Sequence, residues 1–100
     1  LSILILIFFS AEAREEFNEA FDWYSVRSHA AAIGFASEVD VGIEKILQLP
    51  DRFARTFAGC QYYRLQKYPF LIVYFRETTL VTVVAIAHVK RRPGYWKKRV

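Results

Sequence analysis

The chain has little of what disulfide-rich, metal-binding and many catalytic proteins require. One cysteine, Cys60, among 100 residues excludes an internal disulfide framework and is typical of a reducing compartment. The two histidines, His29 and His88, are distant from it and from each other in sequence, so we expect no metal site and no cofactor. No Gly-rich phosphate loop, Ser-His-Asp set or pair of catalytic carboxylates can be recognised. We interpret Cys60 as a small residue at a loop-to-strand junction, because Gly59 and Gln61 beside it would not activate a thiolate.

Negative charge is missing from the C-terminal end of the chain. Residues 88–100 carry six Lys and Arg and no Asp or Glu, whereas the other 87 residues hold eight basic and ten acidic side chains. The formal net charge of +4 therefore lies in this C-terminal segment, which also contains Tyr95 and Trp96. Such a mixture favours polyanions, because Lys and Arg bind phosphates and flat side chains stack on bases. A solvated charged end is the alternative, and the pattern alone does not choose between them.

A long hydrophobic segment is also missing. Residues 1–9 form an apolar run that is too short to span a bilayer, so we expect no membrane partner. The run has no basic residues before it, although residues 10–13 loosely resemble the cleavage site of a signal peptide. Its Ile and Phe content predicts a buried strand over residues 2–9. The chain does not begin with Met, so residue 1 is not taken as the natural start.

A first helix is predicted from residue 11 to residue 25 or a little beyond. Ser10 is a suitable N-cap, and apolar residues recur after it at helical spacing. Glu12, Glu15 and Glu16 lie near the end of the helix where the helix dipole favours negative charge.

A second helix is predicted over residues 30–49, after a break at residues 27–29. Its apolar positions share one face, and Pro50 ends it because a proline disfavours a helical residue before it. Gly34 and Gly42 weaken this helix, and we expect another helix to approach closely there. The two helices should form a hairpin.

The second half of the chain predicts a loop over residues 52–59 and three strands over residues 61–67, 70–76 and 80–89. Short turns between these strands predict an antiparallel meander. The last strand is apolar on both faces and should therefore be central in the sheet. Strict alternation would place Val81, Val83, Ala85 and Ala87 on one face and Leu80, Val84 and Ile86 on the other. We expect a single domain of class α+β, in the order β-α-α-β-β-β, with the helical hairpin on one face of the sheet.

Basic and aromatic side chains supply the candidate site. Arg91 and Arg92 are placed to form bidentate contacts with an anion, and Arg64 would bind a phosphate or neutralise a carboxylate. His88 would act as a general base on a 2′-hydroxyl or as a structural residue at a strand end. Trp96 would stack on bases or, as we favour, clasp the C-terminal segment to the core. Arg76 is expected to be solvated. The predicted anion-binding set is Arg64, Lys90, Arg91, Arg92, Trp96, Lys97 and Lys98.

Five strings in this sequence resemble those of one protein family, the RelE/ParE toxin superfamily of bacterial type II toxin–antitoxin systems. They are FSAEA at residues 9–13, AFDWY at 20–24, LPDRF at 49–53, YPFLIVY at 68–74 and AHVKRRPGYW at 87–96. The third lies at the end of the second helix, the fourth is similar to the middle strand of the family, and the fifth is similar to its C-terminal signature. The resemblance covers about residues 2 to 99 and implies the β-α-α-β-β-β fold.

Two activities compete within that superfamily. RelE-like members cleave messenger RNA on the ribosome with basic side chains and a C-terminal tyrosine, and ParE-like members inhibit DNA gyrase. The resemblance places Arg91 at a RelE arginine and puts Tyr95 or Trp96 about where the RelE tyrosine lies. An earlier RelE arginine, however, is replaced by Leu71, directly after Phe70. This departure favours the ParE-like branch, which includes plasmid stabilisation proteins.

The resemblance therefore implies a cytoplasmic toxin that inhibits DNA gyrase by binding and is neutralised by a cognate antitoxin. A ribosome-dependent mRNA endoribonuclease, with His88, Arg91 and Tyr95 as catalytic residues, is the first alternative. A toxin-fold protein without activity, serving only as antitoxin partner or corepressor, is the second. The implied partners are the antitoxin and gyrase, or the ribosome and mRNA for the nuclease. The implied assembly is a homodimer or a toxin–antitoxin hetero-oligomer.

Overall fold

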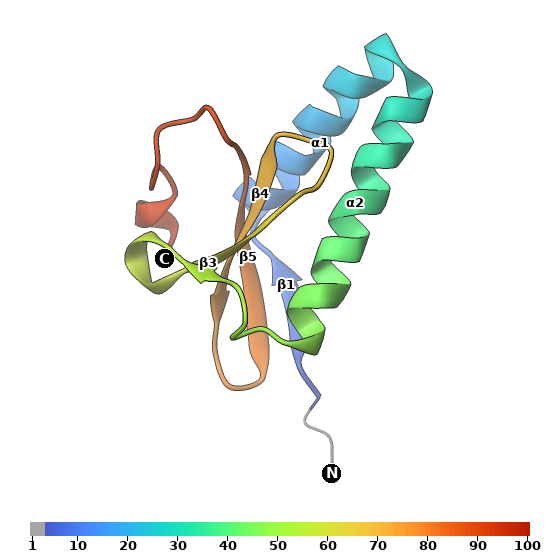
Figure 1. The fold of residues 1–100 in the computed structure, drawn as a ribbon. Helices are drawn as coiled ribbons and strands as arrows, with labels where there is room; N and C mark the ends of the chain where they lie inside the picture. Colours follow the sequence, from blue (N-terminus) through green and yellow to red (C-terminus); the bar gives the residue numbers. More distant parts are fainter. Residues whose placement is uncertain (1–3) are drawn as a thin grey trace.

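A five-stranded mixed sheet is covered on one face by two helices, and a computed structural model describes this arrangement over residues 4–100 (Figure 1). The strand order is β1-β5-β4-β3-β2, with β1 parallel to β5 and the other neighbours antiparallel. The α+β class and the central place of the last long strand are thus confirmed. The elements are β1 (Leu6–Phe9), α1 (Ala11–Arg27), α2 (His29–Gln48), β2 (Ala54–Arg55), β3 (Gln61–Arg64), β4 (Phe70–Arg76), β5 (Leu80–His88) and two short 3₁₀ helices, η1 (Phe57–Gly59) and η2 (Lys97–Arg99).

Two serines set the start of the helices. The Ser10 hydroxyl accepts a hydrogen bond from the Ala13 amide at 3.1 Å, so the predicted cap of α1 is confirmed. Ser28 ends α1 through its own amide and starts α2 by accepting from the Ala31 amide at 3.2 Å. One residue therefore makes the break of the hairpin. No helix within residues 4–100 is long and apolar enough to cross a membrane.

Two glycines of α2, Gly34 and Gly42, lie directly against side chains of the sheet and of the β3–β4 turn. A Cβ added at Gly42 would meet Ile72 Cδ1 at 2.7 Å and the Tyr63 ring at 2.8 Å. One added at Gly34 would collide with the Tyr68 hydroxyl. The expectation of a helix approaching these two glycines is therefore wrong, since both make room for side chains of the sheet and of its β3–β4 turn.

A β-bulge in β5 overturns the predicted division of its faces. The register shifts between Val73 and Tyr74 of β4, which pair with Ala85 and Val83 and leave Val84 as the extra residue. Val81, Val83 and Ile86 consequently pack in the core under the helices. Val84, Ala85 and Ala87 belong to a second cluster around Trp96.

The strand boundaries differ from the prediction in four places, the smallest of which is the end of β5 at His88 rather than at residue 89. Residues 54–55, expected in a loop, form the short edge strand β2 against β3. β3 ends at Arg64 rather than at residue 67 because residues 65–69 turn toward α2, where the Glu38 carboxylate accepts from the amides of Gln66 and Lys67. β1 begins at Leu6, so residues 4 and 5 of the predicted strand are not in it, and residues 2 and 3 lie outside the described residues. The predicted burial of this strand is also wrong, because β1 is at the edge of the sheet and Leu6 and Phe8 are each 58% exposed.

Two polar side chains fasten the loop after α2 to the sheet. Gln61 and Tyr74 both donate hydrogen bonds to the carbonyl of Pro50, and both are buried. Arg76, expected to be solvated, is instead largely covered, with its guanidinium 3.8 Å from the Asp51 carboxylate.

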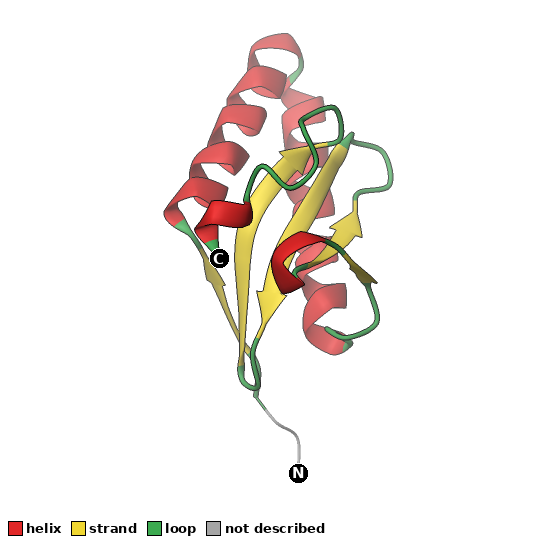
Figure 2. Ribbon diagram, turned by 90° about the vertical axis from the view of Figure 1, so that its left-hand side faces the viewer, coloured by secondary structure: helices red, strands yellow, loops and turns green. Residues whose placement is uncertain are grey.

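The part of the C-terminal segment that follows β5, residues 89–100, lies on the sheet face opposite the helices (Figure 2). Its anchor is Trp96, which is 3% exposed and belongs to the cluster with Cys60 and Val73. The clasp interpretation of Trp96 is therefore confirmed. The predicted position of Cys60, buried between η1 and β3, is confirmed as well.

Candidate functional site

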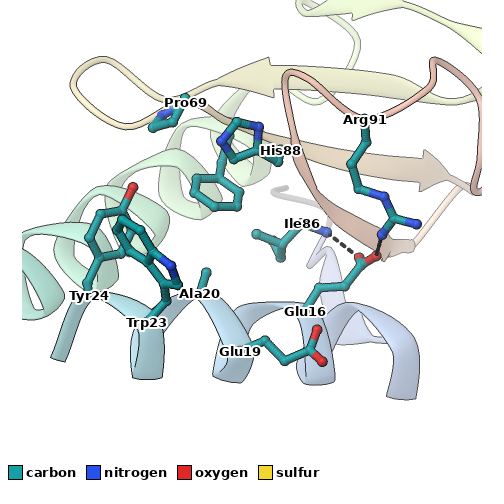
Figure 3. A pocket seen from close by; sticks show the side chains of 10 residues that line it. Glu16, Glu19, Ala20, Trp23, Tyr24, Pro69, Ile86, His88 and Arg91 are labelled. Atoms are coloured by element: carbon teal, nitrogen blue, oxygen red, sulfur yellow. Dashed lines mark hydrogen bonds and ion pairs between the residues drawn. The ribbon is translucent and has the colours of Figure 1, made fainter. Parts of the chain in front are cut away.

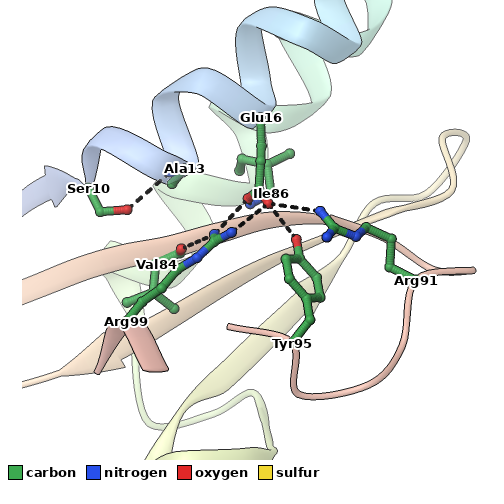
Figure 4. Close-up of polar contacts among 8 residues, drawn as sticks. All are labelled: Ser10, Ala13, Glu16, Val84, Ile86, Arg91, Tyr95 and Arg99. Atoms are coloured by element: carbon green, nitrogen blue, oxygen red, sulfur yellow. Dashed lines mark hydrogen bonds and ion pairs between the residues drawn. The ribbon is translucent and has the colours of Figure 1, made fainter. Parts of the chain in front are cut away.

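One carboxylate, that of Glu16 in α1, joins the helix to the C-terminal segment (Figure 4). Its Oε2 accepts from the Tyr95 hydroxyl at 2.7 Å and lies 3.4 Å from Nη1 of Arg91. The Arg99 guanidinium donates hydrogen bonds to both carboxylate oxygens, each at 3.1 Å. The backbone amide of Ile86 in β5 completes the set at 3.0 Å. Each contact joins residues at least 70 positions apart in sequence. Together they connect α1 to β5 and to the C-terminal segment.

The charges in this network stabilise each other. Arg91 also stacks on the Tyr95 ring, with 3.7 Å between its guanidinium carbon and the ring centroid. Burial, together with the hydrogen bond to Glu16, raises the pKa of Tyr95 well above its usual value. Burial alone would lower the pKa of Arg99, but its hydrogen bonds to Glu16 more than offset this, and that pKa is raised. At neutral pH Tyr95 is therefore a hydroxyl donor and Arg99 a cation.

The predicted catalytic residues are only partly brought together. Arg91 and Tyr95 are in direct contact, but both are engaged with Glu16. His88 lies further along, with its ring against Phe70 at 5.0 Å between centroids and its Nδ1 accepting from the Lys90 amide at 3.1 Å. The structural interpretation of His88, a histidine hydrogen-bonded at the end of its strand, fits these contacts.

His88 and Arg91 border a pocket of about 470 Å³ between α1 and the ends of β4 and β5 (Figure 3). Its lining includes the aromatic side chains of Trp23, Tyr24 and Phe70. Trp23 is about half exposed and already carries the Arg27 guanidinium at 3.6 Å from its ring centroid. The pocket is an apolar hollow with charged residues along its rim.

The predicted anion-binding residues divide into those with a partner in the structure and those without one. Trp96 is buried in the core, and Arg91, whose side chain is 55% exposed, pairs with Glu16. Arg64, on the same sheet face as Tyr62, donates to the Tyr68 carbonyl at 3.1 Å and so fastens the β3–β4 turn. Four of the set are exposed and make neither a side-chain hydrogen bond nor an ion pair within residues 4–100: Lys90, Arg92, Lys97 and Lys98.

The Cys60 thiol has no place in the site. Burial raises its pKa above the usual value, so the thiol stays protonated at neutral pH. This agrees with the interpretation of Cys60 as a packing residue.

Two residues of the network, Glu16 and Arg99, were missed as site residues from the sequence. Glu16 was assigned only to the helix dipole. A signal was nevertheless present, because Glu16 shares one helical stripe with the buried Ala13 and Ala20. A carboxylate on an apolar stripe needs a cation, and the C-terminal segment is the most basic part of the chain.

The architecture places the chain in a known class. It superimposes on a solved structure described as the chromosomal ParDE TA system from P. aeruginosa with a TM-score of 0.74. The match covers 88% of this chain and 98% of that one, at 15% sequence identity, and it shows a shared fold. No curated protein sequence matches the chain.

The family follows from the sequence model. A family described as the ParE toxin of type II toxin-antitoxin system, parDE, matches residues 7–93. The chain therefore belongs to the ParE toxin family of type II toxin–antitoxin systems, and the resemblance found from its sequence strings is confirmed.

Proposed function

We propose that this ParE-family chain inhibits DNA gyrase by binding it, without cleaving RNA, and that a cognate antitoxin neutralises it. The site of action is the cytoplasm, where gyrase works. The exposed cations of the C-terminal segment form part of the inhibitory surface.

The engagement of Arg91 and Tyr95 with Glu16 is the observation that carries this proposal. A ribonuclease of the RelE type needs cations to stabilise the charge that develops on the phosphate. Here the Arg91 charge is matched by a carboxylate at 3.4 Å, and the Tyr95 hydroxyl already donates to the same group. Leu71, where the RelE pattern has an arginine, adds no charge and lies among apolar neighbours of the second cluster.

The antitoxin is expected to be acidic where it meets the C-terminal segment. Complementary charge speeds association and selects the partner, and the exposed cations of that segment offer a positive surface. Apolar antitoxin side chains would cover the sheet and the helical hairpin, where Phe8 and Trp23 are each more than half exposed. These surfaces would cover the few exposed aromatic side chains, whereas most aromatic residues of the chain pack in its core.

Two assays on the purified protein test the proposal. Gyrase supercoiling of relaxed plasmid should be lost as the protein is added, while mRNA on translating ribosomes stays intact. Cuts at codon spacing in the mRNA would instead establish the nuclease. If supercoiling continues, the mRNA stays intact and expression causes no growth arrest, the chain serves only as antitoxin partner or corepressor.

A further inference from the structure

The six cations of the C-terminal segment are sorted by their direction. Arg91 and Arg99 pair with Glu16, although the Arg91 side chain is still 55% exposed, and the other four are exposed without an ion pair within residues 4–100. The local sequence does not mark this division, since three of the four unpaired cations lie between the two paired arginines at positions 91 and 99.

Glu16 is well placed to produce the sorting. Its side chain is only 11% exposed, and both of its oxygens are hydrogen-bonded. A carboxylate buried to this extent is stable only when it is paired, and loss of its partners would be costly. The arginines and Glu16 therefore depend on each other.

Few other polar contacts hold the end of the segment in place. Within residues 4–100, its internal hydrogen bonds are short-range turns, such as that from the Lys97 amide to the Gly94 carbonyl at 3.0 Å. The long-range polar contacts of residues 91–99 are those to Glu16 and one from Arg99 to the Val84 carbonyl at 2.9 Å. Apolar contacts add to this hold: Trp96 is buried, Tyr95 packs partly buried against the same cluster, and the Lys97 ammonium lies 4.7 Å from the centroid of the Phe57 ring. The contacts to Glu16 supply the long-range polar part of the anchoring.

We propose that Glu16 is a positioning residue for the target-binding surface: it fixes residues 91–99 on the sheet and thereby fixes the directions of Lys90, Arg92, Lys97 and Lys98. Glu16 itself does not touch the target. The role in target binding rests on the proposed function, whereas the role in fixing the segment does not.

Positioning and simple attraction predict opposite signs for one substitution. Glu16→Gln removes a negative charge from α1 and leaves Arg91 and Arg99 without their carboxylate partner. The net charge at the surface formed by α1 and the segment therefore becomes more positive. If charge alone governed binding to an acidic surface, inhibition of gyrase would strengthen. If direction governs, inhibition weakens, because a mobile segment must be ordered on binding. Arg99→Gln lowers the positive charge, so both explanations predict weaker inhibition by this variant, and the inhibition by Glu16→Gln is the measurement that separates them.

Backbone amide exchange reads the position of the segment without any target. Glu16→Gln and Arg99→Gln should each speed exchange of the Tyr95, Lys97 and Arg99 amides by about tenfold or more, because a hydrogen bond to a charged group contributes at least that factor. Exchange in the centre of β4 and β5 should change far less. Glu15→Gln is the matched control, because the Glu15 side chain is exposed and makes no hydrogen bond or ion pair within residues 4–100. This substitution should change exchange by no more than about twofold.

The outcomes separate the two proposals. Faster exchange in both variants, with weaker gyrase inhibition in both, is expected. Unchanged exchange in Glu16→Gln, or inhibition by it as strong as that of the wild type, overturns the positioning role. If the wild type leaves gyrase untouched, the proposed function fails, and exchange alone then supports or overturns the hold of Glu16 on the segment.

Discussion

The Tyr95 hydroxyl donates a hydrogen bond to the Glu16 carboxylate at 2.7 Å, across 79 residues of sequence. This contact turns a basic C-terminal end into a part of the fold. It also engages the hydroxyl of Tyr95, the tyrosine proposed as catalytic in the nuclease alternative. Both the proposed function and the positioning role of Glu16 depend on this contact.

Tyr95→Phe should lower the free energy of unfolding by about 1 to 3 kcal/mol, because one donor to a carboxylate is lost while the two arginines remain. Urea unfolding at neutral pH measures this. Tyr62→Phe is the control, since the half-buried Tyr62 hydroxyl has no hydrogen bond within residues 4–100. Equal losses in the two variants would mean that the Glu16 contact contributes little.

Stability should fall in alkali through Tyr74. Burial, followed by the nearby Asp51 charge, raises the pKa of Tyr74 to about 12, above an unfolded value of about 10. A raised pKa means that the folded state keeps its proton longer, so this stability is fully present below about pH 10 and is lost as pH rises toward 12. Urea unfolding at pH 8 and pH 11 should show a smaller alkaline loss in Tyr74→Phe than in the wild type. Equal losses in both would contradict this.

Gly42→Ala should destabilise the protein by about 1 to 3 kcal/mol, although alanine favours helices. The added Cβ would lie 2.7 Å from Ile72 Cδ1, and the Tyr63 ring on its other side is buried as well, so neither neighbour can withdraw easily. Thermal unfolding measures the change. Ser37→Ala, at an exposed position of α2, serves as the control and should be neutral or slightly stabilising. A rise in the melting temperature of Gly42→Ala would refute the close approach of α2 to the sheet.

Lys98→Glu should weaken both gyrase inhibition and antitoxin binding without changing stability, because Lys98 is exposed and makes no ion pair within residues 4–100. Lys67→Glu is matched in charge and exposure but lies in the β3–β4 turn, away from the C-terminal segment. Titration calorimetry with the antitoxin compares the two variants. Equal effects would show that net charge, and not the C-terminal surface, governs binding.

Local signals in the sequence were sufficient for most of the fold. Ser10 capped the first helix where predicted, and the apolar run of residues 70–75 between two short turns correctly predicted the bounds of β4. The bulge at Val84 left no such signal, because valine and alanine are apolar on either face and periodicity cannot detect one extra residue. β2 was not predicted because it has only two residues, both exposed.

The site was harder to predict because its contacts are long-range. The basic segment and the burial of Trp96 followed from local composition and pattern. The pairing of Glu16 with Arg91, Tyr95 and Arg99 required the fold, since α1 and the C-terminal segment meet only when β5 brings them together. Counting charge along the chain consequently assigned Arg91 to the target surface, where the structure gives it an internal partner.

Gyrase supercoiling of relaxed plasmid, titrated with the wild-type protein, tests the central claim most directly. The account predicts a dose-dependent loss of supercoiling that added antitoxin restores, with mRNA on ribosomes left intact at the same concentrations. Full supercoiling at all concentrations, together with codon-spaced cleavage of mRNA, would contradict it.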